Sequence, residues 1–375
     1  MERTVTFAGN LKRYRTKLGL TQKQLAEKIG YTEKSVSKWE SGNALPTMEI
    51  ALKLTDLFSI SLDALMFEDM TCHYFLGIDG GGTKTAFKLI DQEGMLVNQI
   101  TKGPSNPYDI GIESAISVLR DGIHEVCRGI PCSKVTLFAG LAGFGMAGDN
   151  TKILHRFLEK FDFFAFDSGS DIENVAALSD RKKCILVIMG TGFVAYALQG
   201  SDKKRVAGWG QYFDEGGCGY TLGKDAITAV LAAEDGSGAP TLLTNLFAER
   251  LGEPASAHLA RFYQGGKRYI ADFANLVFRA AEAKDAIAQG ILETNAVYVA
   301  EKITAAGKHL SENHIPVIFA GGISSQHEML FPMFKKHLAD KYQLLYLEQA
   351  PVNGAIAKAK AIYQNARQEG SPDVL

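Results

Sequence analysis

Hydrophobic residues are spaced in two different ways along this chain. In residues 10–67 they recur at helical spacing, as Leu11, Tyr14 and Leu18 do, and short polar turns separate the segments. From residue 74 onward, apolar runs of strand length alternate with amphipathic segments and often end in glycine. The first pattern predicts a small all-α domain, and the second predicts a larger α/β domain.

Two short helices with clear start and stop signals are predicted in the first region. Thr21 is a suitable N-cap for a helix over residues 22–29, and Gly30 ends it. Thr32 can then cap a second helix over residues 33–40. Two helices joined by so short a turn form a helix-turn-helix.

Positive charge is concentrated in the same region. The whole chain has a formal net charge of -2, but residues 11–40 contain eight Lys or Arg and three Glu, a local +5. A basic surface of this kind favours a nucleic-acid partner. The alternative is a helical module that binds another protein.

Residues 11–66 resemble the Xre/lambda-repressor-like helix-turn-helix family. The resemblance rests on residues 20–26 (LTQKQLA), 36–42 (VSKWESG), 60–65 (ISLDAL) and Pro46. It implies a DNA-binding domain over residues 1–68 that binds a DNA operator as a homodimer. In this family the second helix enters the major groove.

The resemblance also assigns roles to single residues of this domain. Glu33, Lys34 and Lys38 are expected to face base edges, and Gln22 and Ser35 to lie nearer to phosphates.

The stretch at residues 74–90 (YFLGIDGGGTKTAFKLI) predicts two strands joined by a glycine-rich turn. Consecutive glycines allow a ligand to approach the backbone, and their N–H groups can hold phosphate oxygens. Asp79, at the end of the first strand, is suited to hold Mg²⁺. Two better-known phosphate loops are excluded, because Thr83 precedes Lys84 where a P-loop needs glycine, and Thr85 stands where the dinucleotide fingerprint needs one. For this stretch alone, an ordinary glycine-rich hairpin remains the alternative.

Further buried strands end in glycine turns later in the chain. They are predicted in residues 134–143, 184–192 and 316–323, with short strand character also at 163–166. A closing helix is expected at about 351–367, followed by a disordered tail. This order, in two halves that each open with strands, predicts a duplicated α/β core with a nucleotide between its lobes.

Residues 74–363 resemble the actin/hexokinase/Hsp70 (ribonuclease H-like) architecture, and within it the BadF/BadG-type ATPases and N-acetylglucosamine kinases. The matching motifs are phosphate-1 at 77–85, phosphate-2 at 190–192, the GWG–DEG segment at 208–220 and the adenosine motif at 319–322. The resemblance implies a two-lobe ATPase. Lobe I is expected in residues 74–182 with the C-terminal helix 352–367, and lobe II in residues 183–351.

The resemblance further implies ATP and Mg²⁺ as cofactors, with Asp79 at the metal. The residues expected to bind the cofactor are Asp79, Gly80, Gly81, Gly82, Thr83, Lys84, Thr85, Gly190, Thr191, Gly192, Gly321 and Gly322.

An amino sugar of the N-acetylglucosamine type is the substrate implied for a kinase of this family. Asp171 matches the base that accepts the proton of a sugar hydroxyl, and Asp167 is its rival because it too follows a strand. Asn106 matches a sugar-binding position, or is simply a turn residue before proline. Glu215 aligns with a sugar-binding carboxylate, and Asp214 stands beside it.

Two departures from the family pattern leave turnover open. Phe193 and Val194 follow the phosphate-2 motif, where the family usually has serine and often asparagine. Glu215 replaces an aspartate, which adds one methylene to the pocket. The chain is therefore expected to be an active amino-sugar kinase fused to a DNA-binding domain, or a transcription factor that only senses ATP and sugar. A third hypothesis is an ATPase that acts on a protein partner.

Cysteine spacing and hydropathy bear on the compartment. The five cysteines form no CxxC pair, and no apolar leader or membrane span is present in the sequence. A cytoplasmic protein without a membrane partner is expected. The linker at residues 67–73 is short and lacks the glycine, serine or proline content of a flexible one.

Overall fold

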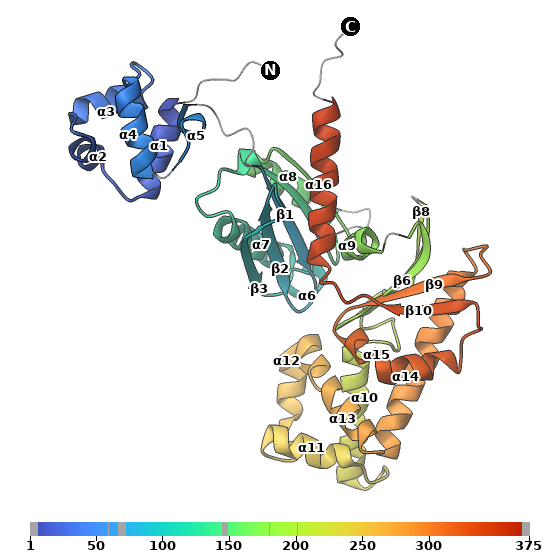
Figure 1. Ribbon diagram of the computed structural model, residues 1–375. Coiled ribbons are helices and arrows are strands. Elements are labelled where there is room, and N and C mark those ends of the chain that lie inside the picture. The colour runs from blue at the N-terminus through green and yellow to red at the C-terminus, as the bar shows by residue number, and fades with distance from the viewer. Residues whose placement is uncertain are drawn as a thin grey trace. The chain divides into compact units, whose positions relative to one another are not determined.

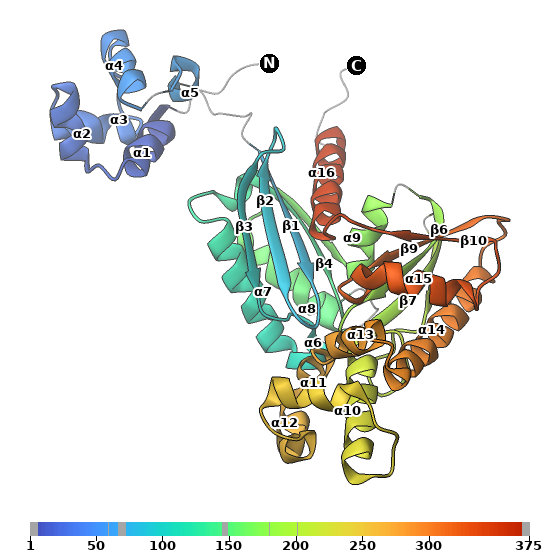
Figure 2. The same cartoon turned by 60° about the horizontal axis from the view of Figure 1, so that its bottom comes forward.

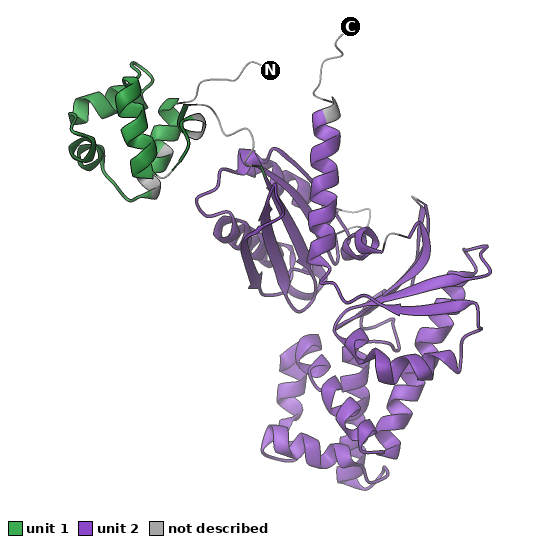
Figure 3. Ribbon diagram, in the orientation of Figure 1, with its two compact units in different colours: residues 1–73 green, residues 74–375 purple. Residues whose placement is uncertain are grey.

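The computed structural model describes residues 7–58, 60–66, 73–144, 149–179, 181–200 and 202–369. The chain divides into two compact units, residues 1–73 and 74–375 (Figure 3). Most of the expected linker, residues 67–72, and the end of the expected tail, residues 370–375, lie outside the described residues. Within the described ranges, no helix is both long enough and apolar enough to cross a membrane.

The first unit is all α-helical, as its residue spacing predicts. Its helices are α1 (Phe7–Lys17), α2 (Gln22–Ile29), α3 (Glu33–Glu40), α4 (Met48–Phe58) and α5 (Leu62–Met66). Thr21 and Gln24 form a capping box at the start of α2, and Gly30 ends it at a φ of +74°. Leu25, Val36 and other apolar side chains fill one small core.

The second unit begins with a mixed sheet of strand order β3-β2-β1-β4-β5. The strands are β1 (Tyr74–Gly80), β2 (Thr85–Asp91), β3 (Leu96–Lys102), β4 (Val135–Leu141) and β5 (Ala165–Gly169). β1, β2 and β3 form an antiparallel meander, whereas β4 and β5 continue the sheet parallel to β1.

The second sheet repeats this topology. Its order is β10-β9-β6-β7-β8, with antiparallel β6, β7 and β8 followed by parallel β9 and β10. The strands are β6 (Lys183–Met189), β7 (Phe193–Gln199), β8 (Asp202–Val206), β9 (Ile315–Ala320) and β10 (Tyr342–Tyr346). The expected duplicated α/β core is thus confirmed in the pairing of the strands.

Helices cover both faces of the first sheet, with α16 on the face opposite α7 and α8 (Figures 1 and 2). The helices of this half are α6 (Pro107–Ile110), α7 (Ile112–Val126), α8 (Asp149–Leu158), α9 (Asp171–Leu178) and α16 (Val352–Glu369). α16 lies so close to β1 that a Cβ on Gly77 would stand 2.8 Å from the Val352 carbonyl oxygen and the Ile356 nitrogen. α9 packs against α16 and also against β6 of the second sheet.

α9 packs on one face of the second sheet, and a larger helical region packs on the opposite face (Figure 1). It contains α10 (Gly219–Asp235), α11 (Leu242–Leu251), α12 (Leu259–Ala271), α13 (Ala274–Glu282), α14 (Ala286–Gly307) and α15 (His327–Lys335). Short 3-10 turns occur at Cys132–Lys134, Glu159–Phe161, Ala255–His258 and Ile323–Gln326.

Three details differ from the sequence-based expectations. The strand expected at residues 163–166 is β5 (Ala165–Gly169), because pairing with β4 starts only at Ala165 while Phe163 packs into the core. The expected tail begins too early, since α16 continues to Glu369. β7, β8 and β10 were not predicted, and β8 is a lysine-rich edge strand without apolar alternation.

Candidate functional site

The two glycine turns of the sheets meet in space. One joins β1 to β2, and in it the Gly81 N–H donates to the Lys84 carbonyl oxygen at 3.0 Å. The other joins β6 to β7, where the Gly190 N–H donates to the Gly192 carbonyl oxygen at 2.9 Å. The hydroxyls of Thr83 and Thr191 are hydrogen-bonded to each other. Two loops 108 residues apart in the sequence therefore form one site.

The glycines of these turns serve two purposes. Gly80 is required for packing, because a Cβ there would meet the Ser105 hydroxyl and lie 2.5 Å from Leu141. Beside Gly81 and Gly190, by contrast, a Cβ would find no atom within 4 Å. The backbone at these two positions therefore faces open space into which a ligand can approach.

The side chains that follow the first turn point in different directions. Lys84 is exposed, and its charge partly offsets the rise that burial causes in the pKa of nearby Asp79. Thr85 is fully buried and donates its hydroxyl to the Gly103 carbonyl oxygen at 2.8 Å. The Thr85 side chain thus supports the hairpin from behind.

Asp79 is the second-last residue of β1, directly before the first glycine turn. Asn174 of α9 donates from Nδ2 to an Asp79 carboxylate oxygen at 2.7 Å. Burial raises the pKa of Asp79 to about 6, although the Asn174 hydrogen bond and the Lys84 charge oppose that shift. A half-buried carboxylate beside two open glycine loops is suited to hold a divalent cation.

Asp171 occupies the first turn of α9, close enough to Asp79 for their charges to interact. Burial, together with the neighbouring Asp79 charge, raises its pKa to about 7, although the Ile172 N–H and the Arg205 charge act in the opposite direction. Its rival Asp167 is exposed on the edge strand β5, where it accepts the Ser168 N–H at 2.7 Å. Asp171 is the more enclosed of the two carboxylates, and a raised pKa of about 7 suits a base that works near neutral pH.

The second glycine turn is fixed from the helical region. The N–H groups of Gly219 and Tyr220, at the start of α10, donate to the carbonyl oxygens of Gly190 and Thr191 at 2.8 and 3.2 Å. The loop backbone is therefore held by the helix that follows the GWG–DEG segment.

The two candidate carboxylates of that segment have different surroundings. Asp214 is buried and accepts the N–H groups of Gly208 and Gly210 at 3.1 and 2.8 Å, and the Tyr298 hydroxyl at 3.1 Å. Its oxygens thus hold the turn together. Glu215 is exposed and is free to face a ligand.

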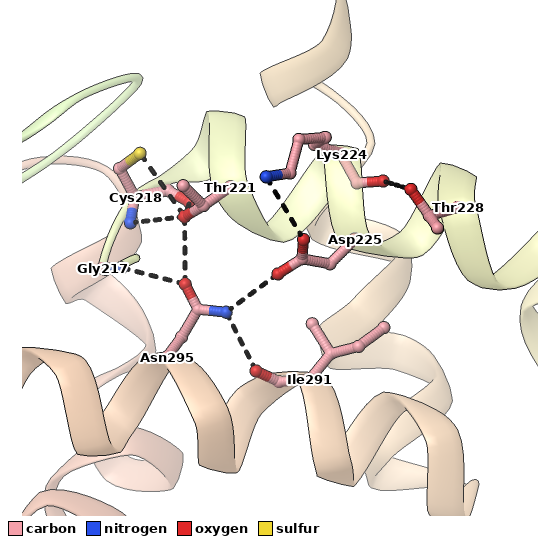
Figure 4. A network of polar contacts seen from close by, with 8 residues as sticks. All are labelled: Gly217, Cys218, Thr221, Lys224, Asp225, Thr228, Ile291 and Asn295. Atoms are coloured by element: carbon pink, nitrogen blue, oxygen red, sulfur yellow. Dashed lines mark hydrogen bonds and ion pairs between the residues drawn. The ribbon is translucent and has the colours of Figure 1, made fainter. Parts of the chain in front are cut away.

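A polar network anchors the end of the same segment to α14 (Figure 4). Asn295 accepts the Gly217 N–H at 2.9 Å and lies 2.9 Å from the Thr221 hydroxyl. Its amide nitrogen donates to the Ile291 carbonyl oxygen at 2.9 Å. Asn295 is only 5% exposed. It therefore anchors the backbone at Gly217, two residues after Glu215, from inside the protein.

The remaining predicted site residues lie in turns. Gly321 has a φ of +98°, and a Cβ there would stand 2.5 Å from the Met189 carbonyl oxygen, whereas Gly322 faces open space. Asn106 caps α6 by accepting the Tyr108 N–H at 3.2 Å, and it donates to Asp109 at 2.8 Å. Both ends of the Asn106 amide are therefore engaged within its own turn.

Two polar residues near Asp171 were missed by sequence reasoning. Asn174 bonds to Asp79 across 95 residues of sequence, and an asparagine inside a helix carries no local signal of that role. Arg205 donates to the carbonyl oxygens of Ala207 and Gly208, and its guanidinium lies 4.8 Å from the Trp209 ring centre. Its charge lowers the pKa of Asp171, against the larger effect of burial, while its hydrogen bonds hold the GWG turn.

In the first unit, α3 presents its expected DNA-reading side chains to solvent. Glu33, Lys34 and Lys38 are exposed and Ser35 is half-buried beside its cap, Thr32. Gln22 differs, because its amide donates to Glu40 at 2.7 Å.

The residues around the two glycine loops have the chemistry to hold a nucleotide and a metal ion. The open space beside Gly81 and Gly190 can admit phosphate oxygens, and the carboxylates of Asp79 and Asp171, whose charges interact, suit a cation. Ser105 also has a buried hydroxyl with no hydrogen-bond partner among the described residues. The residues therefore fit ATP with Mg²⁺.

The chain is similar in sequence and fold to proteins named as N-acetylglucosamine kinases. N-acetyl-D-glucosamine kinase of Dictyostelium discoideum is 25% identical over 73% of this chain and 92% of its own length. The N-acetylmuramic acid/N-acetylglucosamine kinase of Clostridium acetobutylicum is 26% identical over 77% of this chain and 98% of its own. A crystal structure described as a putative N-acetylglucosamine kinase of Chromobacterium violaceum superposes with a TM-score of 0.62, at 23% identity, over 77% of this chain and 99% of that one.

Family models divide the chain at the same place as the structure. A helix-turn-helix model matches residues 11–65. The model of the BadF/BadG/BcrA/BcrD ATPase family matches residues 76–359, which is most of the chain. The chain therefore belongs to the BadF/BadG/BcrA/BcrD ATPase family, and it carries a helix-turn-helix domain ahead of its ATPase domain.

Proposed function

We propose that this protein transfers the γ-phosphate of ATP to a hydroxyl of an amino sugar of the N-acetylglucosamine type and binds a DNA operator as a transcriptional regulator. The observation that carries the proposal is the meeting of the two glycine loops at the Thr83–Thr191 hydrogen bond, with Asp79 and Asp171 close enough for their charges to interact. The substrate class is supported by two similar kinases of such sugars, because this chain aligns with 92% and 98% of their lengths.

The roles of the side chains follow from their surroundings. When bound, ATP with Mg²⁺ supplies the transferable phosphoryl group and the counter-charge. Asp171 accepts the proton of the sugar hydroxyl, for which a pKa of about 7 is suitable. Asp79 would hold the metal, and N–H groups of the two glycine loops other than those of Gly81 and Gly190 would hold the phosphates. Positioning and charge neutralisation contribute most of the remaining rate enhancement.

Radiolabelled ATP and a panel of N-acetylglucosamine, N-acetylmuramic acid and glucosamine, with glucose as a control, test this function. Asp171→Asn should bind ATP as before and turn over about 10²–10⁴-fold more slowly, the usual contribution of a general base. Asp167→Asn is the matched control and should keep its activity. Loss of activity in Asp167→Asn alone would move the base to that residue.

A sensor with little or no turnover is the second candidate. The residues after the phosphate-2 loop favour it, because Phe193 is buried with its ring centre 5.7 Å from that of Tyr298, and a Cβ on Gly208 would lie 2.5 Å from Val194. Neither residue supplies a hydroxyl near the transferred phosphate. ATP and sugar binding by calorimetry, with no labelled sugar formed, would support this candidate over the kinase.

The regulatory part of the proposal rests on the first unit. The exposed residues of α3 are expected to read an operator, with the protein acting as a homodimer because paired half-sites are usual for such domains. Since this function needs access to the chromosome and to ATP, we propose the cytoplasm as its compartment.

A further inference from the structure

α12 contains a break that changes the direction of its last turn. Gly266 has φ +64° and ψ -169°, values outside the helical region and open essentially to glycine alone. Lys267 follows the break immediately. The break therefore decides where the Lys267 side chain goes.

The end of α12 is packed onto the start of α10. A Cβ on Gly223 would collide with the Ile270 carbonyl oxygen, and one on Gly219 would stand 3.4 Å from Ala271. Gly219 is the residue whose N–H holds the Gly190 carbonyl oxygen. The last turn of α12 is thus brought to the phosphate-2 loop by contacts that leave no room for side chains.

The ammonium group of Lys267 lies against that loop. Its Nζ atom is 3.3 Å from the point where a Gly192 Cβ would stand. Lys267 is half-buried and, among the described residues, makes no hydrogen bond or ion pair. Other lysines of this unit, such as Lys203, Lys183 and Lys358, each pair with a glutamate. A half-buried cation without a counter-charge beside an open glycine loop is suited to an anionic ligand.

We propose that Lys267 binds the phosphates of the nucleotide from the helical region of the second sheet. This inference rests on the proposed function, because it requires ATP in the site. Lys84 follows Thr83 on the opposite loop, and the Thr83 and Thr191 hydroxyls join the two loops. The phosphate chain is therefore flanked by one lysine from each half of the ATPase domain.

Calorimetric titration of the full chain with ATP, ADP and adenosine tests the proposal. Lys267→Ala should bind ATP about tenfold to a hundredfold more weakly, the loss expected for a hydrogen bond to a charged group. Adenosine, which has no phosphate, should bind both proteins equally. Arg268→Ala is the matched control, because Arg268 is the exposed neighbour of Lys267 on the same helix.

A second variant moves the lysine without removing it. Alanine tolerates the backbone angles of Gly266 poorly, so Gly266→Ala should shift Lys267 away from the loop and weaken ATP binding. When Gly266→Ala is combined with Lys267→Ala, the second substitution should weaken ATP binding little further, because both remove the same contact.

Equal ATP affinity of wild type and Lys267→Ala would overturn the inference while leaving the nucleotide site in place. A parallel loss of adenosine binding would overturn it too, since that result would indicate a structural role. If the wild-type chain binds no ATP, the proposed function fails first and the inference with it.

Discussion

Asp79 and Asp171 owe their chemistry to partners that are distant in the sequence. Their positions, at the end of a strand and the start of a helix, could be predicted because strand ends and helix starts are local features. The proximity of Asp171 to Asp79, and the support from Asn174, arise only when α9 packs beside β1. Side chains that act across two elements leave no periodic pattern from which to infer them.

The raised pKa of Asp171 predicts the pH dependence of the kinase reaction. A base must be ionised, so kcat/KM for the sugar should fall about tenfold per pH unit below a pKa of about 7 and level off above it. Steady-state rates between pH 5 and 9 measure this. The residual activity of Asp171→Asn should lack the acidic limb. A limb near pH 4, the ordinary value for a carboxyl group, would contradict the assignment.

Single elements differ in how far their sequence reveals them. β1, β4 and β6 were predictable because buried strands read as unbroken apolar runs that end in glycine. β8 was not, because an edge strand of charged residues has no apolar alternation, although it carries Arg205 to the site. The break in α12 was equally hidden, since two adjacent glycines do not reveal the direction in which a helix turns.

The anchor between α14 and the GWG–DEG segment should contribute to stability. Asn295→Ala leaves the buried Gly217 N–H without its acceptor, at a cost of about 1–3 kcal/mol, whereas the Thr221 hydroxyl keeps the Cys218 carbonyl oxygen as an acceptor at 2.9 Å. Thermal unfolding should show this as a lower Tm. Thr294→Ala, on the exposed face one residue earlier, is the control and should change Tm much less. Equal Tm values for Asn295→Ala and wild type would show that the network is not needed.

The exposed face of α3 should determine operator recognition. Lys34→Ala and Lys38→Ala should each weaken specific binding by about 1–3 kcal/mol if they contact bases. Gel shifts on the operator and on shuffled sequences separate base contacts from phosphate contacts, which weaken all sequences alike. Lys53→Ala is the control, because Lys53 on α4 pairs with Glu49. If neither α3 variant binds differently from wild type, this helix does not enter the groove.

At the scale of the whole molecule, the order of the glycine turns predicted the duplication, because each half repeats the same strand pattern. The sequence did not reveal how the halves are held together. That depends on α9 and α16, which pack on each other, while α9 also contacts the second sheet. Packing between helices so far apart in the chain has no local signature.

A regulator that combines these two units should show reciprocal coupling between its ligands. Saturating ATP and amino sugar should change operator affinity at least fivefold, the lower end of typical coupling free energies of about 1–3 kcal/mol. Operator DNA should change sugar affinity by the same factor. Fluorescence anisotropy at fixed salt measures both directions.

A flexible Gly/Ser insert within residues 67–73 provides the control. It should reduce the coupling and leave the affinity of each site unchanged. Unchanged operator affinity at saturating ligand would mean that the two activities are independent.

The close packing of α16 on β1 has a consequence for how the protein is made. β1 leaves the ribosome before the other strands of the ATPase domain, but the helix that covers it, α16, begins only at Val352. The helix-turn-helix unit has its own core and can fold while translation continues. The phosphate-1 strand can be covered only after α16 has left the ribosome. Every nascent chain therefore passes through a stage in which the DNA-binding unit is folded and the nucleotide site is incomplete.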